Sequence, residues 1–320
     1  MTSSTAPGTI AGGPRTAAVR SSGSGRPRSR GIRRHRWWSP WLFAAPGLIV
    51  VCAFSLWPFC STLYNSLTDR RTLVGGSFVG FENYRALLHD DAFWIGLRNS
   101  SLYVAGVVPA LVILPLLLAL LVQRRIPGIT FFRAAFYTPV VASVVVVGLI
   151  WVWLLDDRGL LNSIVTAVGG SPVNFLGEQW TLLLSAMALT IWKGLGYYMI
   201  IYLAALADVP RELHEAAAVD GAGALRRFLT VTIPAVRSTM VLVAALSAVS
   251  AFKVFTEVYV LAGPNGGPAG EDTTLVMLVQ RTGTGLTGRV GYSSAISVVI
   301  FVVVVALMLL TLRADRKEDA

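Results

Sequence analysis

The chain has 320 residues, of which 54% are hydrophobic and 14% are charged, and its formal net charge is +10 at pH 7. Soluble domains carry about 25% charged residues, so this composition excludes an ordinary soluble enzyme or binding module. The apolar stretches lack the alternation of apolar and polar residues that a membrane β-barrel needs. The sequence therefore predicts an all-α polytopic membrane protein.

The N-terminal segment is rich in Ser, Gly, Pro and Arg and contains almost no large apolar side chains. Such a segment buries too little surface to offset the entropy lost on ordering, so residues 1–36 are expected to form a disordered basic cytoplasmic tail. Trp37, Trp38 and Trp41 follow and suit a membrane interface. A cleaved signal peptide is disfavoured because the tail is long and no small-residue cleavage site follows the apolar stretch.

Six apolar stretches follow, and each is long enough to cross the hydrocarbon core as a helix. They define a predicted transmembrane domain over residues 37–312, which is followed by a charged cytoplasmic tail over residues 313–320. The predicted spans are Trp41–Leu67, Ser101–Gln123, Ala134–Leu155, Trp180–Leu206, Ser238–Ala262 and Tyr292–Leu312.

Basic residues concentrate in the two terminal tails, in the Gln123–Arg133 connection and between the fourth and fifth spans. Because positively charged loops resist translocation, both termini are predicted to be cytoplasmic. The outer loops carry acidic residues instead, among them Glu271 and Asp272. The basic residues can face anionic membrane lipid at the inner surface, so the positive charge requires no nucleic acid.

A charged segment, residues 208–234, separates the fourth and fifth spans and has its own helix signals. Asp208–Pro210 provides a possible cap and a proline for a first helix, and Gly221 can turn the chain with a positive φ. A second short helix is expected over Ala224–Thr230, ending before Pro234. From the residues alone, the segment is either an ordinary cytoplasmic loop with helices or a docking site for a partner.

Ionisable residues within the spans are candidates for a solute pathway, because an intramembrane charge costs about 2.5–3.5 kcal/mol and rarely faces lipid. Lys193 lies in the fourth span. Lys253 and Glu257 lie in the fifth, and their i,i+4 spacing predicts a pair on the face that Ser250 approaches. Tyr197 offers an aromatic face to a sugar ring. Packing between helices or snorkelling would explain the same residues without a solute.

No convergent catalytic set, metal-binding cluster or Gly-x4-Gly-Lys-Ser/Thr phosphate loop is visible in the sequence. The chain is therefore predicted to be a transport component, not an enzyme, with no cofactor of its own. Any energy from ATP must come from a partner.

The charged segment also contains a longer motif, in which an acidic residue and two alanines precede a glycine and an apolar–x–apolar–proline ending. Its residues are Glu215, Ala216, Ala217, Gly221, Val231, Ile233 and Pro234. This spacing resembles the EAA signature of inner-membrane permease subunits of binding-protein-dependent ABC importers, with conservative exchanges at Val231 and Ile233. Phe78–Tyr84 and Phe132–Pro139 are similar to blocks of the carbohydrate-uptake branch, which includes maltose, glycerol-phosphate and lactose permeases. The resemblance covers roughly residues 40–312.

This resemblance implies the type I ABC importer permease fold in a bacterial cell membrane. In that family the EAA loop forms a coupling helix that docks in a groove of the cytoplasmic ATPase. The residues implied to dock are Glu215, Ala216, Ala217, Asp220, Gly221 and Pro234.

The resemblance further implies three partners: a second permease subunit that completes a heterodimer, a cytoplasmic ABC ATPase dimer that uses ATP–Mg, and an extracytoplasmic solute-binding protein. The implied function is ATP-driven import of a sugar or sugar-like solute. A non-sugar solute such as a polyamine or a phosphate ester is an alternative. An ion-coupled secondary transporter is a weaker one, because the only acidic residue within the spans, Glu257, lies near the outer end.

Overall fold

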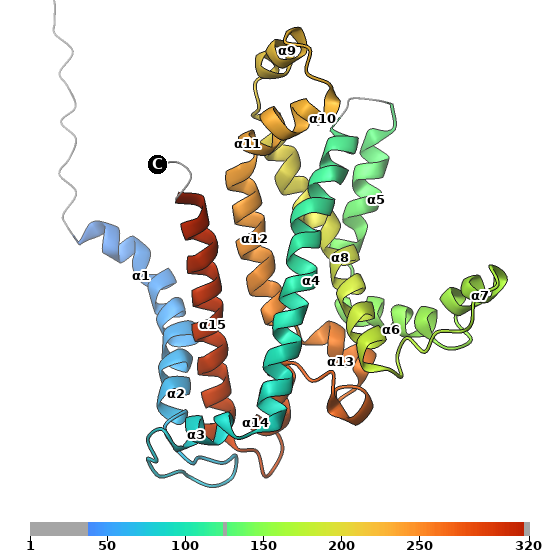
Figure 1. Cartoon of the computed structure of the whole chain (residues 1–320). Coiled ribbons are helices and arrows are strands. Elements are labelled where there is room, and N and C mark those ends of the chain that lie inside the picture. The colour runs from blue at the N-terminus through green and yellow to red at the C-terminus, as the bar shows by residue number, and fades with distance from the viewer. Residues whose placement is uncertain (1–37, 124–126, 317–320) are drawn as a thin grey trace, which may run out of the picture. The chain divides into compact units, whose positions relative to one another are not determined.

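The computed structural model describes residues 38–123 and 127–316, which form helices and connecting loops (Figure 1). These residues contain no β-strand, and one isolated antiparallel bridge joins Thr68 to Phe78. The all-α prediction is confirmed. The predicted N-terminal tail lies outside the described residues, and a helix continues through Arg316 into the predicted C-terminal tail.

Four helical stretches are long and apolar enough to cross a membrane, and two bent helix pairs bring the total to the predicted six if each pair is one span. The first stretch, Trp41–Asn65, runs through most of α1 (Ser39–Val51), a π-helical segment (Cys52–Leu56) and α2 (Trp57–Asn65). The next two are α4 (Asp91–Val122) and α8 (Gln179–Ala207), and the last, Val290–Thr311, belongs to α15 (Val290–Arg316). The bent pairs are α5 (Ile129–Val141) with α6 (Val144–Leu155), which continues to α7 (Leu160–Ala167), and α10 (Ala224–Arg227) through α11 (Ile233–Ala235) with α12 (Arg237–Phe252).

Shorter elements connect these helices. They are α3 (Glu82–Leu88), α9 (Arg211–Val219), a π-helical segment (Phe228–Thr232), α13 (Thr256–Ala262), a 3₁₀ turn (Pro268–Gly270) and α14 (Leu275–Gly283). The chain divides into two compact units between Val51 and Cys52, and the packing described below is that of the unit that begins at Cys52.

The third predicted span, Ala134–Leu155, is not one continuous helix. The chain bends by 99° between α5 and the stretch Val144–Ala167, which comprises α6 and α7, and Ala142 has extended backbone at the bend. The predicted span is therefore a bent one, and the bend follows Pro139, which lies inside α5. Lys193 of α8 stabilises the bend by hydrogen bonds that are described below.

The fifth predicted span, Ser238–Ala262, is also divided, because α12 ends at Phe252 and α13 begins at Thr256. The hydroxyl of Thr274 donates a 3.0 Å hydrogen bond to the freed carbonyl of Val254. A backbone group freed within a membrane needs an internal partner, so this bond makes the break tolerable.

Helices α4 and α8 pack against each other through the larger of two buried clusters. The buried Tyr103 of α4 donates to the carbonyl of Ala186 at 2.8 Å, and Tyr202 of α8 donates to the carbonyl of Val112 at 3.0 Å. These bonds satisfy both buried hydroxyls and fix the register of the two helices. Helix α12 packs on α4, and α15 packs on α12 and α14.

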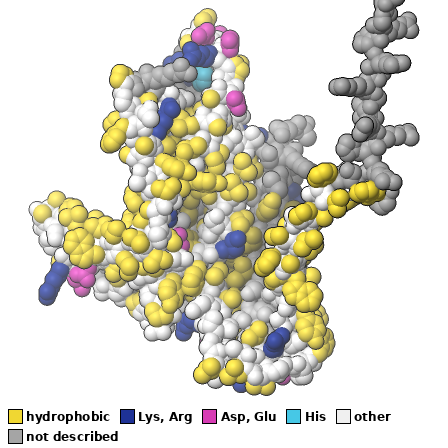
Figure 2. Space-filling view, turned by 180° about the vertical axis from the view of Figure 1, so that it is seen from behind, with side chains coloured by type: hydrophobic (Ala, Val, Ile, Leu, Met, Phe, Trp, Pro, Cys, Tyr) yellow, Lys and Arg dark blue, Asp and Glu magenta, His cyan; other side chains and the backbone are white. Residues whose placement is uncertain are grey.

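The connections gather at two ends of this unit (Figure 1). The C-terminal ends of α4 and α15 lie with α9, α10 and α11 at one end, here named the α9 end. Helices α3 and α14 lie at the opposite end, here named the α3 end. Hydrophobic side chains cover much of the surface between the two ends (Figure 2).

The backbones of α5 and α8 approach each other closely at Gly196. A Cβ atom there would lie 2.2 Å from the carbonyl oxygen of Phe136, so the backbone itself would have to move. We expect Gly196→Ala to destabilise the protein by about 1–3 kcal/mol, the usual cost of overpacking. The melting temperature of the purified protein measures this cost.

Gly106→Ala is the matched control on α4. Its added Cβ would meet mainly the flexible thioether of Met187, at 2.8 Å, which can move aside. Equal melting temperatures for the two variants would contradict a backbone contact at Gly196.

Candidate functional site

Helix α9 ends in a hydrogen-bonded turn at Gly221. The amide of Gly221 donates to the carbonyl of Ala218 at 3.1 Å, and the amide of Ala222 donates to the carbonyl of Ala217 at 2.9 Å. Gly221 has φ +74°, as the residue after a helix does in a Schellman motif. The predicted turn is therefore present, and its hydrogen bonds hold the end of α9 in one conformation.

The predicted docking residues lie on the surface of the α9–α11 segment, which projects at the α9 end (Figure 1). Ala217 is half-buried, and the others are exposed. The exposed residues are Glu215, Ala216, Asp220, Gly221 and Pro234. Because these residues are exposed, a partner can contact them. The docking role itself stays a prediction.

Large apolar side chains on the same segment are exposed as well. Leu213 and Val219 of α9 are 49% and 88% exposed, and Leu225 and Leu229 are 71% and 53% exposed. Sequence reasoning emphasised charges and small residues here and missed these four. Apolar side chains clustered on a projecting, otherwise polar segment are typical of a protein interface.

The second helix of the segment does not end before Pro234, which corrects the prediction. Residues Ala224–Ala235 are helical throughout, with a π-helical turn at Phe228–Thr232. A proline ring would collide with the carbonyl four residues earlier in a regular α-helix, and the wider π turn relieves that clash. The segment then bends by 69° at Val236 into α12.

Lys193 of α8 binds the carboxyl end of α5 at the bend of the third span. Its ammonium donates to the carbonyls of Pro139, Val140 and Ala142 at 3.0, 3.2 and 2.8 Å. These carbonyls have lost helical partners, and a cation is favourable at the negative end of a helix dipole. All three ammonium donors are used, so Lys193 has a clear structural role, while contact with a solute stays a prediction.

Lys253 and Glu257 do not lie on one continuous helix, so their predicted i,i+4 pairing is wrong. Lys253 follows the last residue of α12 and is exposed, whereas Glu257 is in the first turn of α13. No ion pair joins them in the described part of the chain. The non-helical backbone of Phe255, with φ −140° and ψ −61°, separates the two side chains.

Two other predicted pathway residues lie on α8 and α12. Tyr197 is 46% exposed, and its ring centre is 5.1 Å from that of Tyr198 in an edge-to-face arrangement. Ser250 is exposed and lies near Tyr198. The structure thus brings Tyr197 and Ser250 to neighbouring surfaces through Tyr198, and a solute contact at either residue stays a prediction.

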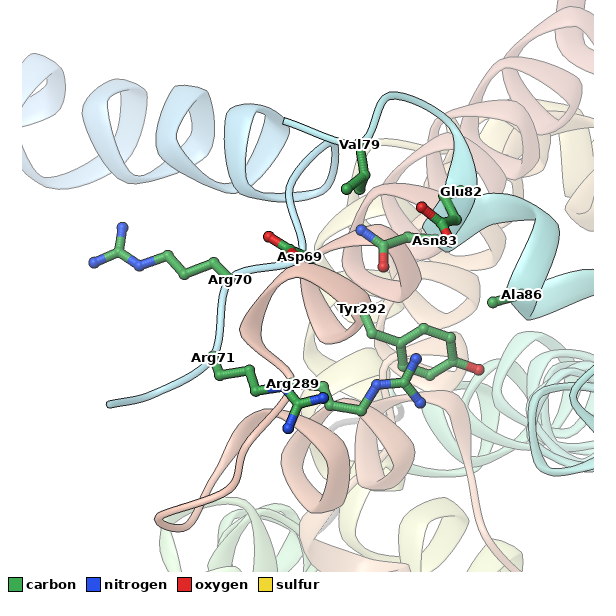
Figure 3. Close-up of a pocket in the computed structure, with 9 residues that line it drawn as sticks. All are labelled: Asp69, Arg70, Arg71, Val79, Glu82, Asn83, Ala86, Arg289 and Tyr292. Atoms are coloured by element: carbon green, nitrogen blue, oxygen red, sulfur yellow. The ribbon is translucent and has the colours of Figure 1, made fainter. Parts of the chain in front are cut away.

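A pocket of about 240 Å³ opens at the α3 end (Figure 3). The Arg289 guanidinium carbon lies 4.2 Å from the centre of the Tyr292 ring, and Asn83 donates to two carbonyls of the preceding loop at 2.9 and 2.8 Å. Polar and charged groups therefore dominate this opening. The lining residues are Asp69, Arg70, Arg71, Val79, Glu82, Asn83, Ala86, Arg289 and Tyr292.

Asp272 is buried in the loop between α13 and α14. Neither carboxylate oxygen has a hydrogen-bond partner among the described residues. Burial raises the pKa of Asp272, the negative charge of Glu271 adds to the rise and Arg98 opposes it, so that the pKa is about 7. The loop packs tightly, since a Cβ on Gly267 would lie 2.4 Å from an Asp272 oxygen.

Residues 99–318 match the family described as "Binding-protein-dependent transport system inner membrane component". The chain belongs to this family. It is therefore a permease component of a transport system, as predicted, and its helices place it in a membrane as a multi-pass protein.

Curated relatives extend over most of the chain. The arabinooligosaccharides transport system permease protein AraP of Bacillus subtilis is 32% identical over 279 residues, covering 86% of this chain and 88% of AraP. The diacetylchitobiose uptake system permease protein NgcF of Streptomyces coelicolor is 32% identical over 309 residues, covering 91% of this chain and 86% of NgcF. The sn-glycerol-3-phosphate transport system permease protein UgpA of Escherichia coli O157:H7 is 32% identical over 293 residues, covering 89% of this chain and 96% of UgpA.

A solved structure has the same fold. The bacterial ABC transporter involved in the import of the acidic polysaccharide alginate contains a chain that superposes with a TM-score of 0.76 at 21% identity, covering 88% of this chain and 96% of that chain. A second structure shows the alginate transporter in complex with a periplasmic protein that holds an alginate pentasaccharide. Its matching chain also gives a TM-score of 0.76, at 22% identity, covering 88% of this chain and 98% of that chain. The predicted type I importer permease fold is confirmed.

Removal of the Lys193 ammonium would leave three carbonyls at the end of α5 without their donor. We expect Lys193→Met to lower the stability of the protein by at least ~1.5–3 kcal/mol, the contribution of one hydrogen bond to a charged group. Lys253→Met is the matched control, because Lys253 is exposed, and its effect should stay within ~0.5 kcal/mol. Thermal unfolding of the purified proteins compares the stabilities of the two variants. Equal losses of stability would contradict the structural role of Lys193.

The raised pKa of Asp272 makes stability depend on pH with a defined sign. The folded-state pKa of about 7 lies above the ordinary value of about 3.9, so ionisation destabilises the fold progressively between these values and fully above them. We expect Asp272→Asn to raise the melting temperature at about pH 8, by the equivalent of ~2 kcal/mol, and to change it little near pH 4.

The exposed Asp157→Asn is the control and should show no such pH-dependent gain. An Asp272→Asn variant with the same stability change at both pH values would show that ionisation of Asp272 does not destabilise the protein.

Proposed function

We propose that this chain and a second permease subunit form the translocation path of an ATP-driven ABC importer for a sugar or sugar-like solute. The path lies between the two permeases, and the solute passes through it without covalent change. An ABC ATPase dimer binds the α9 end and hydrolyses ATP with Mg²⁺. An extracytoplasmic binding protein delivers the solute at the α3 end.

The observation that carries this proposal is the surface of the α9–α11 segment. Exposed Glu215 and Ala216 lie with exposed Leu213 and Val219 on α9, whose end is held by the turn at Gly221. Exposed Leu225 follows on α10. A rigid projection with apolar anchors suits a groove in a partner. Because the segment runs through Val236 into α12, a displacement of the partner can reach the spans as a rigid-body movement.

The proposed orientation puts the α9 end and both chain termini on the cytoplasmic side of a bacterial cell membrane. Arg211, Arg226 and Arg227 lie at the α9 end, in agreement with the tendency of basic residues to remain inside. The α3 end then faces outward, with its polar pocket toward the binding protein.

The solute class is supported by the relatives, whose names specify arabinooligosaccharides, diacetylchitobiose and lactose. The relative named for sn-glycerol-3-phosphate favours a phosphate ester as the second candidate. Thermal-shift screening of the cognate binding protein separates these classes, since a bound ligand stabilises the state to which it binds.

Reconstitution of the complete transporter tests the energy source. We expect uptake into vesicles to require the ATPase subunits, ATP and the loaded binding protein. Uptake that persists without ATP, or that follows a proton or sodium gradient, would favour the ion-coupled alternative.

Gly221→Pro should uncouple ATP hydrolysis from transport. Proline cannot adopt φ +74° and has no amide to donate to Ala218, so the closing turn of α9 is lost. We expect coupled uptake to fall about tenfold or more, while membrane insertion stays normal and ATP hydrolysis no longer responds to the loaded binding protein.

Gly223→Ala is the control on the same loop. Gly223 has a negative φ of −66°, and an added Cβ there meets no atom within 4 Å. This variant should transport like the wild type, and a Gly221→Pro variant with unchanged coupled uptake would rule against docking by this segment.

A further inference from the structure

A cavity of about 1100 Å³ lies at the α9 end, between the ends of α4, α5 and α8 and the beginning of α9. Three basic side chains line it, Arg133 from α5 and Arg211 and His214 from α9. Leu203 and Leu206 of α8 provide an aliphatic wall. The cavity is therefore amphipathic, with basic groups beside hydrocarbon.

The charge of this cavity has one sign. No Asp or Glu among the described residues lines it, and the neighbouring Asp208 and Glu212 are exposed and do not contribute to the lining. Arg133 donates from Nε and Nη2 to the carbonyl of Val122 at 3.1 and 2.7 Å, which leaves its Nη1 donors for a ligand. A lining whose ionisable groups are all basic attracts an anion, and a low-dielectric wall strengthens that attraction.

The lining does not suit a sugar. Sugar rings stack on aromatic faces, and no Phe, Tyr or Trp of the described chain lines this cavity. A phosphate group joined to hydrocarbon matches both parts of the lining, because the phosphate accepts from guanidinium donors and the hydrocarbon covers the leucines.

The surface beside the cavity is also apolar. Leu121 of α4 and Phe131 of α5 are 71% and 73% exposed, and each is adjacent in sequence to a residue that lines the cavity, Leu120 and Thr130. Exposed apolar side chains at the end of a membrane span face lipid or a partner subunit. An acyl chain can therefore run from the cavity onto this surface.

We propose that this cavity binds the headgroup of an anionic phospholipid, with Arg133, Arg211 and His214 around the phosphate and an acyl chain along α4 and α5. The proposal rests on the proposed function in one respect, the position of the α9 end at the cytoplasmic surface, where anionic headgroups gather. Because Arg211 and His214 belong to α9, the bound lipid links the bilayer surface to the segment that meets the ATPase.

The test uses the complete transporter, reconstituted in phosphatidylcholine vesicles with or without phosphatidylglycerol and then examined by native mass spectrometry for retained lipid. We expect preferential retention of phosphatidylglycerol, which Arg211→Gln weakens about fivefold and Arg211→Lys preserves. Excess inorganic phosphate should not displace the lipid, because phosphate alone makes no contact with the leucine wall.

Arg226→Gln is the matched control, since Arg226 is an exposed arginine of the same segment that does not line the cavity. Equal retention of the two lipids would overturn the proposal. Equal losses of phosphatidylglycerol retention in Arg211→Gln and Arg226→Gln would overturn it as well. Complete displacement by inorganic phosphate would show a free-phosphate site instead. Retention is measured without ATP or solute, so a failed transport assay with lipid retained would count against the proposed function alone.

Discussion

The hydrogen bonds from the Lys193 ammonium to the end of α5 are the interaction on which the arrangement of the spans depends. Within a bilayer, a helix can bend sharply only where the protein itself satisfies the freed backbone groups. Lys193 supplies three donors to three carbonyls at this point. The resulting bend, 99° between α5 and the stretch Val144–Ala167, directs the chain away from α5, and Gly148 of α6 lies against Val260 of α13.

The break between α12 and α13 also frees backbone groups, and other side chains of the protein satisfy them. Thr274 donates to the carbonyl of Val254, and Asn99 of α4 donates to the carbonyl of Thr273 at 3.0 Å. Polar residues from distant parts of the chain thus stabilise the irregular backbone that joins α12, α13 and α14. Thr274 and Asn99 are in this respect structural residues.

The sequence predicted the spans well because membrane helices are recognised by a local property, a long apolar run. It also predicted the turn at Gly221, since glycine after a helix is a local signal. The bend at Ala142 and the break after Phe252 could not be predicted in this way, because the partners that stabilise them, Lys193 and Thr274, are distant in sequence. The burial of Asp272 was not predicted either, because it depends on how the loop between α13 and α14 packs.

The candidate docking surface was only partly predictable. Its charged and small residues follow from the motif, but the exposure of Val219 and Leu225 depends on which face of each short helix turns outward. The basic cavity was not predictable, because it combines side chains of α5 and α9 with a wall from α8. Such combinations arise only when the helices are assembled.

The bend at Val236 gives α12 the geometry of a lever. Its 16 residues extend about 24 Å at 1.5 Å per residue, from the α9 end to the break at Lys253. A tilt of about 5° at Val236 would therefore shift the Phe252 end by about 2 Å. Phe252 is buried in the cluster that α14 and α15 share, so a small angular change at one membrane surface becomes a change of packing near the other.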